Sequence, residues 1–505
     1  MLKISDIQTR IKLGQLEREL ATARDHDSWH QLAQQHDDAS GAARWRKLED
    51  SSLYDNAEIR KRHDHLGKLL KERNYTDLLF ALNEGLHGNL EGIGRPALYH
   101  RAKTGSKHLI DSYSEMVNES LLVIANASYR QISRRKKIDF FRRAGHCYGR
   151  SALMLSGGAG LIYFHHGVVQ TLLDHDLLPN ILSGASAGSW ICAQLGTRTD
   201  EELKDGHFSD LVYEFPSGKH NPLKVLMGLD KEYSASDFLE QALDQFSDDL
   251  TFQEAYEKTG RYINISISPA EKHQMSRLMN AITSPNVYIR SAVHASSSLP
   301  GVVPPAMLYA KGSDGRPRPY LPTRKWCDGS FADDLPAKRL ARLFGVNHYL
   351  VSLINPVAIP FVEDPNIRPV RGLKRAAFDL MLQGMQDLLL STERMSAKLG
   401  ANYLGPGLLM ADALLDQKYT GDINLILEKR DYRWRDVLFD YVNDSDDSVV
   451  EGMKMAGARS TWPKLPVIRN ATRVARTIDE ILLQFDDGKS GSPNERDRHP
   501  ITKAI

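Results

Sequence analysis

The chain has 505 residues, of which 41% are hydrophobic and 26% charged, and its formal net charge at pH 7 is +1. This length predicts two or three domains, and the balanced charge argues against a nucleic-acid partner, since proteins that bind nucleic acids are usually strongly basic. The 3 cysteines include no C-x-x-C pair, which excludes a disulfide framework and a zinc ribbon and suits a reducing compartment.

Residues 1–149 are predicted to form a helical module. Apolar residues recur there at steps that place them on one helix face: Ile4, Ile7, Ile11, Leu16, Leu20, Leu66, Leu69, Leu70, Leu78, Leu79 and Leu82. The N-terminal stretch carries acidic side chains, so we expect an amphipathic helix and not a signal peptide. The sequence contains no run of about 18 apolar residues, so any membrane contact should be peripheral.

A different pattern begins at Arg150. SALMLSGGAG (151–160) is a short apolar run that ends in glycines, and a segment with helical periodicity follows it. GRYINISISPA (260–270) and VNHYLVSLINP (346–356) are rich in β-branched residues and are further strand candidates. Strands that alternate with helices predict an α/β domain with a mainly parallel sheet covered on both faces.

This pattern divides the chain into four expected parts. The helical module is followed by the α/β domain over residues 150–372. A mainly helical C-terminal part, residues 373–485, is expected to pack on that domain. The polar stretch 486–505 is expected to be a disordered tail.

The segment ILSGASAGSW (181–190) contains a G-x-S-x-G pattern, with Ser186 between Gly184 and Gly188. A serine hydroxyl becomes a useful nucleophile only when it is exposed and has a base and a site for the oxyanion. The two glycines allow a tight turn in which a side chain would clash. The residues before the turn predict a strand and those after it a helix, which is the setting of a nucleophile elbow. We therefore predict that Ser186 is the nucleophile.

The glycine-rich turn after the first predicted strand is the candidate oxyanion site. Backbone N–H groups at a turn that opens a helix point toward a bound anion. The predicted donors are the amides of Gly157, Gly158 and Ala159, together with Ala187 after the serine. A nucleotide-phosphate loop is the alternative, but neither G-x-x-x-x-G-K-[ST] nor G-x-G-x-x-G is present.

Asp328, in KWCDGSFADDLP (325–336), is the candidate base. An aspartate before glycine is often no more than a turn residue. A Ser-Asp-His triad with His348 is a competing arrangement, because the order of the three residues fits. However, His348 begins an apolar, strand-like run, where a structural histidine is more common.

These motifs, in this order, resemble the patatin-like phospholipase family. The match is closer to its triacylglycerol lipase subgroup, in which a helical module precedes the patatin domain. It covers roughly residues 50–430 and includes ASSSLPGVVPP (295–305) and QKYTGDINLI (417–426). The resemblance implies a three-layer α/β/α sandwich and a Ser186–Asp328 dyad. The implied activity is that of a serine esterase, a lipase or phospholipase A, that cleaves carboxylic esters of acylglycerols or glycerophospholipids through an acyl-enzyme.

The chain departs from the family pattern at three places. The glycine loop lacks the basic residue that many patatins carry after it. Ser330 stands where glycine is usual, and INPVAIPF (354–361) lacks a histidine that the subgroup has there. Some members of the subgroup also carry an acyltransferase motif, H-x-x-x-x-D, and none of the 18 histidines here is followed by such an aspartate.

The resemblance implies a lipid substrate, no cofactor, and a cytoplasmic protein that associates peripherally with a membrane or a lipid-droplet-like surface. The oligomeric state stays open. His165 and His166 lie next to the glycine loop, but no cysteine or carboxylate completes a metal site there, so we expect no metal. A transacylase that uses the same serine and a non-catalytic, membrane-recruiting scaffold are the competing functions.

Two segments are candidates for lipid contact. SYRQISRRKKIDFFRR (128–143) combines basic and aromatic residues, which can attract an anionic membrane surface. LKRAAFDLMLQGMQDLLLSTERM (373–395) is apolar over much of its circumference. The alternatives are a solvated helix for the first segment and a core helix for the second.

Overall fold

The computed structural model describes residues 4–208, 234–244, 249–271, 275–299, 303–355, 359, 421–428 and 447–487. The contacts divide the chain into two compact units. The helical unit comprises residues 1–151, 340–348 and 461–505, and the sheet unit comprises residues 152–339 and 349–460. In the part of the chain that is described, no helix has both the length and the apolar character needed to cross a membrane.

The helical unit is built from helices at both ends of the chain. They are α1 (Ile4–Thr22), α2 (His26–Ser40), α3 (Ala42–Lys47), α4 (Asn56–Lys71), α5 (Tyr75–Gly85), α6 (His108–Asn126), α7 (Arg134–Tyr148) and α20 (Leu465–Asp487), with short 3₁₀ turns η1 (Leu90–Gly92), η2 (Pro96–Leu98) and η7 (Trp462–Lys464). Several begin with a capping side chain. Asp25, for example, accepts the N–H of Ser28 at 2.8 Å.

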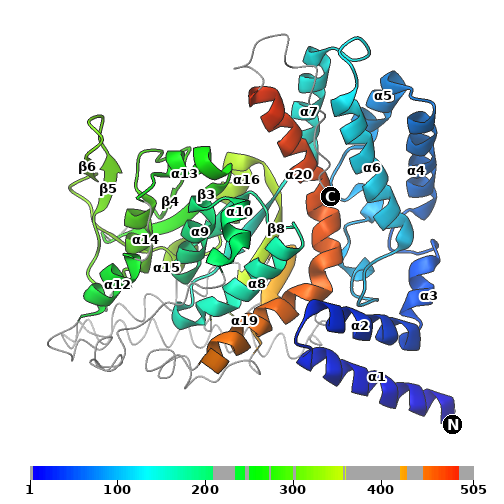
Figure 1. Cartoon of the computed structure of the whole chain (residues 1–505), viewed down its shortest axis with the longest axis horizontal. Coiled ribbons are helices and arrows are strands. Elements are labelled where there is room, and N and C mark those ends of the chain that lie inside the picture. The colour runs from blue at the N-terminus through cyan, green and yellow to red at the C-terminus, as the bar shows by residue number, and fades with distance from the viewer. Residues whose placement is uncertain are drawn as a thin grey trace, which may run out of the picture. The chain divides into compact units, whose positions relative to one another are not determined.

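The C-terminal helix α20 packs against α6 and α7 (Figure 1). Four of its apolar side chains belong to the core of the helical unit: Val474, Ile478, Ile481 and Phe485. Of the part 373–485 that was expected to pack on the α/β domain, α20 thus belongs to the helical unit, whereas residues up to 460 belong to the sheet unit. The reason is that an apolar stripe determines which face of a helix is buried but not which partner covers it. Residues 373–395 and 488–505 lie outside the described residues.

The sheet unit contains one main sheet with the strand order β4-β3-β2-β1-β8-β9, and β7 pairs with β3. Its strands are β1 (Arg150–Leu155), β2 (Ile181–Gly184), β3 (Tyr262–Pro269), β4 (Arg277–Met279), β7 (Trp326–Asp328), β8 (Val346–Leu353) and β9 (Ile423–Ile426). The pairs β1–β2, β2–β3 and β8–β9 are parallel, whereas β4 and β7 are antiparallel to β3. A separate hairpin joins β5 (Leu308–Lys311) to β6 (Pro317–Tyr320).

Helices cover this sheet, and the middle of the sheet is buried. The described helices of the sheet unit are α8 (Ile162–Asp174), α9 (Ala187–Thr197), α10 (Asp200–Glu202), α12 (Ala235–Leu243), α13 (Phe252–Thr259), α14 (Ile289–Ser297), α15 (Ser330–Asp333) and α19 (Asp447–Thr461), with the short turns η3 (Ala159–Leu161) and η4 (Leu203–His207). α16 (Ala337–Phe344) contains residues of both units. Every residue of β2 is buried, as expected for a parallel strand covered on both faces. The predicted arrangement, helices first and then a mainly parallel sheet with helices, is confirmed.

The two phenylalanines of the basic segment 128–143 are buried, whereas Tyr129 is 42% exposed. Phe140 and Phe141 lie in the core of the helical unit, and Lys137 is buried on the same face of α7. Arg135 and Arg142 are exposed. The segment therefore fits the description of a solvated helix, and its phenylalanines are not available for lipid contact.

Candidate functional site

The G-x-S-x-G segment forms a tight turn between β2 and α9. Ser186 is the N-cap of α9 and has φ 49° and ψ −121°, a left-handed conformation that residues other than glycine rarely adopt. A Cβ on Gly184 would lie 2.2 Å from the carbonyl oxygen of Gly188, and a Cβ on Gly188 would lie 2.1 Å from that of Leu155. Both flanking positions therefore require glycine, as a nucleophile elbow does.

A serine of α14 holds the elbow in place. The backbone N–H of Ser186 donates to Oγ of Ser296 at 3.0 Å, and the Ser296 hydroxyl donates to the carbonyl of Ser266, on β3, at 2.8 Å. The Trp190 indole N–H donates to Oγ of Ser297 at 2.8 Å. Sequence reasoning did not assign these serines a role, because nothing local to them indicates a partner about a hundred positions away.

Two strands bring Ser186 and Asp328 together. On β3, Gly184 pairs with Ile265 and Asp328 pairs with Ile267. β4 pairs with these same two residues of β3, so it occupies the opposite edge of β3, and β2 and β7 share one edge. β2 runs parallel to β3 and β7 runs antiparallel to it, so their carboxyl ends face each other. Ser186 follows the end of one strand, and Asp328 is the last residue of the other.

Asp328 is a buried carboxylate with several hydrogen-bond donors around it. Its side chain is 2% exposed. Burial raises the pKa of Asp328 to about 6, and hydrogen bonds from the Ser330 N–H and from the hydroxyls of Ser186 and Ser330 oppose the rise. The Ser330 N–H lies 2.8 Å from Oδ1. A carboxylate in contact with the serine hydroxyl and ionised at neutral pH can accept the proton of that hydroxyl.

The glycine loop passes directly against the serine. A Cβ on Gly157 would lie 3.2 Å from Cβ of Ser186 and 3.0 Å from Cβ of Ser330. Ala159 has φ 48° and begins the turn η3 that leads into α8. The predicted donor Ala187 is the first residue of α9, where backbone N–H groups lack partners within the helix.

The structure differs from the expectation for Gly157. Its N–H donates to Oδ1 of Asp334 at 2.9 Å, so it is already occupied as a donor. Asp334 comes six positions after Asp328 and is buried. The sequence carries no signal for this bond, because its two ends lie 177 positions apart.

The buried side chain of His165 contacts the residue just before the glycine loop. Its Nε2 lies 3.0 Å from the carbonyl of Ser156, and its Nδ1 lies 2.7 Å from the hydroxyl of Ser352 on β8. Burial lowers the pKa of His165 to about 4, so the ring is neutral. His166 stacks on Phe208 with ring centroids 4.7 Å apart, and burial lowers its pKa to about 3. Among the described residues, no group of His, Cys, Asp and Glu could hold a metal ion.

His348 lies at the other end of the parallel strands. Its Nδ1 is 3.2 Å from the hydroxyl of Ser151, near the first residue of β1. Gly157 and Ser186 instead follow the carboxyl ends of β1 and β2. This position argues against a triad that includes His348.

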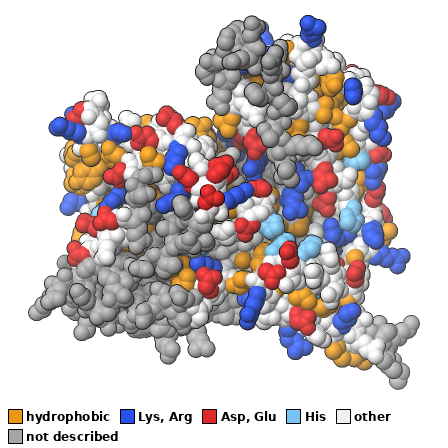
Figure 2. Space-filling model, viewed as in Figure 1, with side chains coloured by type: hydrophobic (Ala, Val, Ile, Leu, Met, Phe, Trp, Pro, Cys, Tyr) orange, Lys and Arg blue, Asp and Glu red, His pale blue; other side chains and the backbone are white. Residues whose placement is uncertain are grey.

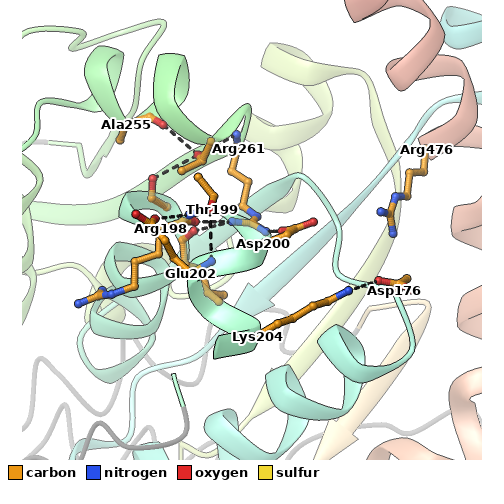
Figure 3. Close-up of polar contacts among 12 residues, drawn as sticks. Asp176, Arg198, Thr199, Asp200, Glu202, Lys204, Ala255, Arg261 and Arg476 are labelled. Carbon is orange, nitrogen blue, oxygen red and sulfur yellow. Dashed lines mark hydrogen bonds and ion pairs between the residues drawn. The ribbon is translucent and has the colours of Figure 1, made fainter. Parts of the chain in front are cut away.

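The far end of α9 is also anchored. Arg261 is buried and donates to the carbonyls of Leu195 and Arg198, both at 2.8 Å (Figure 3). Its guanidinium also pairs with Asp200, the first residue of α10. The helix that begins at the nucleophile is therefore fixed at both ends.

Comparisons with known proteins identify two regions. A model described as a domain of unknown function, DUF3336, matches residues 6–146, and a patatin-like phospholipase model matches residues 153–341. The first match ends at residue 146 and the second begins at residue 153. The two matches follow the predicted order of a helical module and a patatin domain.

Curated relatives match over most of the chain. Patatin-like phospholipase domain-containing protein AN0408 of Emericella nidulans is 31% identical, over 95% of this chain and 67% of that protein. A similar protein of Aspergillus fumigatus, AFUA_1G04970, is 30% identical, over 95% of this chain and 70% of its own length. Triacylglycerol lipase SDP1L of Arabidopsis thaliana is 32% identical, and the match spans 55% of that protein. The chain therefore belongs to the patatin-like phospholipase family of lipid ester hydrolases.

Proposed function

We propose that this chain is a serine lipid acyl hydrolase that cleaves carboxylic esters of acylglycerols or glycerophospholipids, with Ser186 as nucleophile and Asp328 as base. The observation that carries the proposal is the meeting of β2 and β7 along one edge of β3. This strand pairing places Ser186, in a strained turn, next to Asp328, a carboxylate that is ionised at neutral pH. An elbow, a base and adjacent amides are what acyl transfer requires.

In the proposed reaction, Asp328 accepts the hydroxyl proton of Ser186 while Oγ bonds to the ester carbonyl carbon. The negative charge that develops on the carbonyl oxygen is held by the amides of Gly158, Ala159 and Ala187. The alcohol then leaves with the proton from Asp328, and the acyl group stays on Ser186. Water then attacks this acyl-enzyme with Asp328 again as base, the bond from the acyl carbon to Oγ breaks, the proton on Asp328 returns to Ser186, and the carboxylic acid leaves. Loss of one oxyanion donor should lower the rate on the order of 10²–10³-fold.

Peripheral contact with a lipid surface is part of the proposal. Figure 2 shows hydrophobic side chains gathered where Figure 1 draws the β5–β6 hairpin, with basic side chains beside them. Tyr309 is 43% exposed and Leu321 is 36% exposed. Lys311 and Arg318 belong to the same hairpin. The exposed apolar side chains lie away from the polar turn 312–316, while Lys311 pairs with Glu254 and Arg318 with Asp314. An exposed apolar surface of this kind suits contact with a lipid interface.

The test is an activity panel with the purified protein. The substrates are a p-nitrophenyl ester, triolein, phosphatidylcholine and a lysophospholipid, and Ser186→Ala is the control. We expect ester hydrolysis that Ser186→Ala abolishes, and labelling of the wild type by a fluorophosphonate. A folded wild type that neither hydrolyses esters nor reacts with the fluorophosphonate would favour the scaffold alternative. Acyl transfer to an added alcohol in preference to water would favour the transacylase.

A further inference from the structure

Asp334 is a buried carboxyl group that the proposed reaction does not use. Its side chain is 1% exposed, and its Oδ1 accepts the N–H of Gly157 at 2.9 Å. Asp334 follows the strand that ends in Asp328, whereas Gly157 opens the loop that carries the oxyanion amides. One hydrogen bond therefore joins the segment of the base to the segment of the oxyanion donors.

The peptide group between Ser156 and Gly157 is held at both ends. Its carbonyl oxygen lies 3.0 Å from Nε2 of His165, and its N–H is bonded to Asp334. A peptide group is planar, so these two bonds fix its orientation. These bonds therefore fix the first peptide plane of the loop, from which the residues that carry the oxyanion amides continue.

The next peptide group is fixed from its carbonyl side. The Ser156 hydroxyl donates to the carbonyl of Gly157 at 3.1 Å and accepts the N–H of Ile354 at 2.9 Å. The N–H of Gly158 belongs to this same plane and, in a trans peptide, points away from that carbonyl. Its direction is therefore set before any substrate binds, which is the property that makes an oxyanion donor effective.

We propose that Asp334 is a positioning residue for the oxyanion site: by accepting the N–H of Gly157, its carboxyl group sets the direction of the Gly158 and Ala159 amides. This inference rests on the proposed function and assigns a role within it to a residue that does not touch the substrate. The inference also gives the three loop amides different roles. The Gly157 N–H holds the loop in place, and the Gly158 and Ala159 N–H groups donate to the oxyanion.

The role does not require a charge on Asp334. Burial, with repulsion from Asp328 and Asp333, raises the pKa of Asp334 well above its usual range, while bonds from the Gly157 N–H and the Asn355 side chain oppose the rise. A neutral carboxyl group still has a carbonyl oxygen that accepts an N–H. An asparagine has the same shape and the same acceptor, so it should replace Asp334 with little loss.

The test compares Asp334→Asn with Asp334→Ala and with Asp334→Leu, which keeps the size but has no acceptor. Asp333→Asn is the matched control, because Asp333 is adjacent but its carboxylate pairs with Arg339 at 3.1 Å. For each folded variant, kcat and KM are measured on a p-nitrophenyl ester. The inhibition constant Ki of a trifluoromethyl ketone, which forms a tetrahedral adduct with the serine, is measured in parallel.

For the Ala and Leu variants we expect kcat to fall about 10- to 100-fold and Ki to rise by a similar factor, with KM within about twofold of wild type. Asp334→Asn and Asp333→Asn should stay within about threefold of wild type in all three quantities. A general loss of stability would not move kcat and Ki together while leaving KM unchanged. This pattern therefore distinguishes positioning from a merely structural role.

Several results would overturn the proposal. One is an Ala or Leu variant with wild-type kcat and Ki. Another is an Asp334→Asn variant that folds but loses as much as the Leu variant. Failure of both acceptor-free variants to fold would show that Asp334 serves folding and not positioning. If the wild type itself showed no hydrolysis that depends on Ser186, the proposed function would fail before this inference was tested.

Discussion

The backbone N–H of Ser330 donates to Oδ1 of Asp328 at 2.8 Å, two positions along the chain. Together with the Ser330 hydroxyl, it lowers the pKa of a carboxyl group that burial raises to about 6. Ser330 is the residue that stands where patatins usually have glycine. The substitution therefore adds a hydroxyl donor to the carboxylate that we propose as the base.

We predict that kcat/KM falls as the pH drops below about 6, because Asp328 must be ionised to accept a proton. Ser330→Ala removes the hydroxyl that lowers this pKa, so the midpoint should move to higher pH. The measurement is the pH profile of ester hydrolysis. Ser298→Ala is the control, because that hydroxyl bonds the carbonyl of His294 instead. If Ser330→Ala and the wild type had the same midpoint, the fall in kcat/KM at low pH could not be assigned to Asp328.

Asp328→Asn should abolish hydrolysis and stabilise the fold at high pH. The folded pKa of about 6 exceeds the ordinary 3.8, so the contribution of this group to stability is present below pH 3.8 and is lost as the pH rises through 6. The variant should therefore gain up to about 3 kcal/mol in free energy of unfolding at pH 8 and less than about 1 kcal/mol at pH 4.

Urea unfolding at the two pH values measures this difference. Ser186→Ala is the control, because it also removes activity but leaves the buried carboxylate in place. A gain of equal size at pH 8 and pH 4 would mean that relief of a buried charge is not the cause.

Ser296→Ala should weaken the elbow. The change removes the acceptor of the Ser186 N–H and the donor to the Ser266 carbonyl, which should cost about 1–2 kcal/mol of unfolding free energy. A displaced nucleophile should also react about 10- to 100-fold more slowly with a fluorophosphonate. Ser297→Ala, which touches Trp190 instead, should keep the wild-type labelling rate. Equal rates for the two variants would argue that Ser296 does not position the nucleophile.

His348→Ala should keep hydrolysis within about threefold of wild type, whereas a histidine of a catalytic triad would lose about 10⁴-fold. The reason is that His348 bonds the hydroxyl of Ser151 near the beginning of β1 and not near Ser186. The measurement is kcat/KM of a folded variant on the p-nitrophenyl ester. A loss near the larger value would restore the triad as the mechanism.

The parts of this candidate site that neighbouring residues form could be predicted from the sequence. The turn at Ser186 could be found because its glycines, strand and helix lie within a few residues of one another. The bond between Gly157 and Asp334 and the support from Ser296 could not be found, because both depend on the register of strands far apart in the chain. Register is a property of the assembled sheet and not of any short segment.

The basic segment 128–143 shows a different limit. Its composition favours a membrane surface, but four residues of α7 at helical spacing are buried: Lys137, Phe140, Phe141 and Ala144. That i, i+3, i+4, i+7 spacing was visible in the sequence and indicates one buried face. Periodicity was therefore the better guide here than composition.

The assignment of α20 to the same unit as α6 and α7 has a consequence for biosynthesis. Residues 149–464 separate α7 from α20, and at about 5–20 residues per second a ribosome needs roughly 15 to 60 s to make them. Until α20 emerges, the nascent N-terminal helices expose the face that later contacts Ile478, Ile481 and Phe485. A growing chain with such an uncovered apolar face is a substrate for holding chaperones, and a premature stop codon before α20 would make that condition permanent.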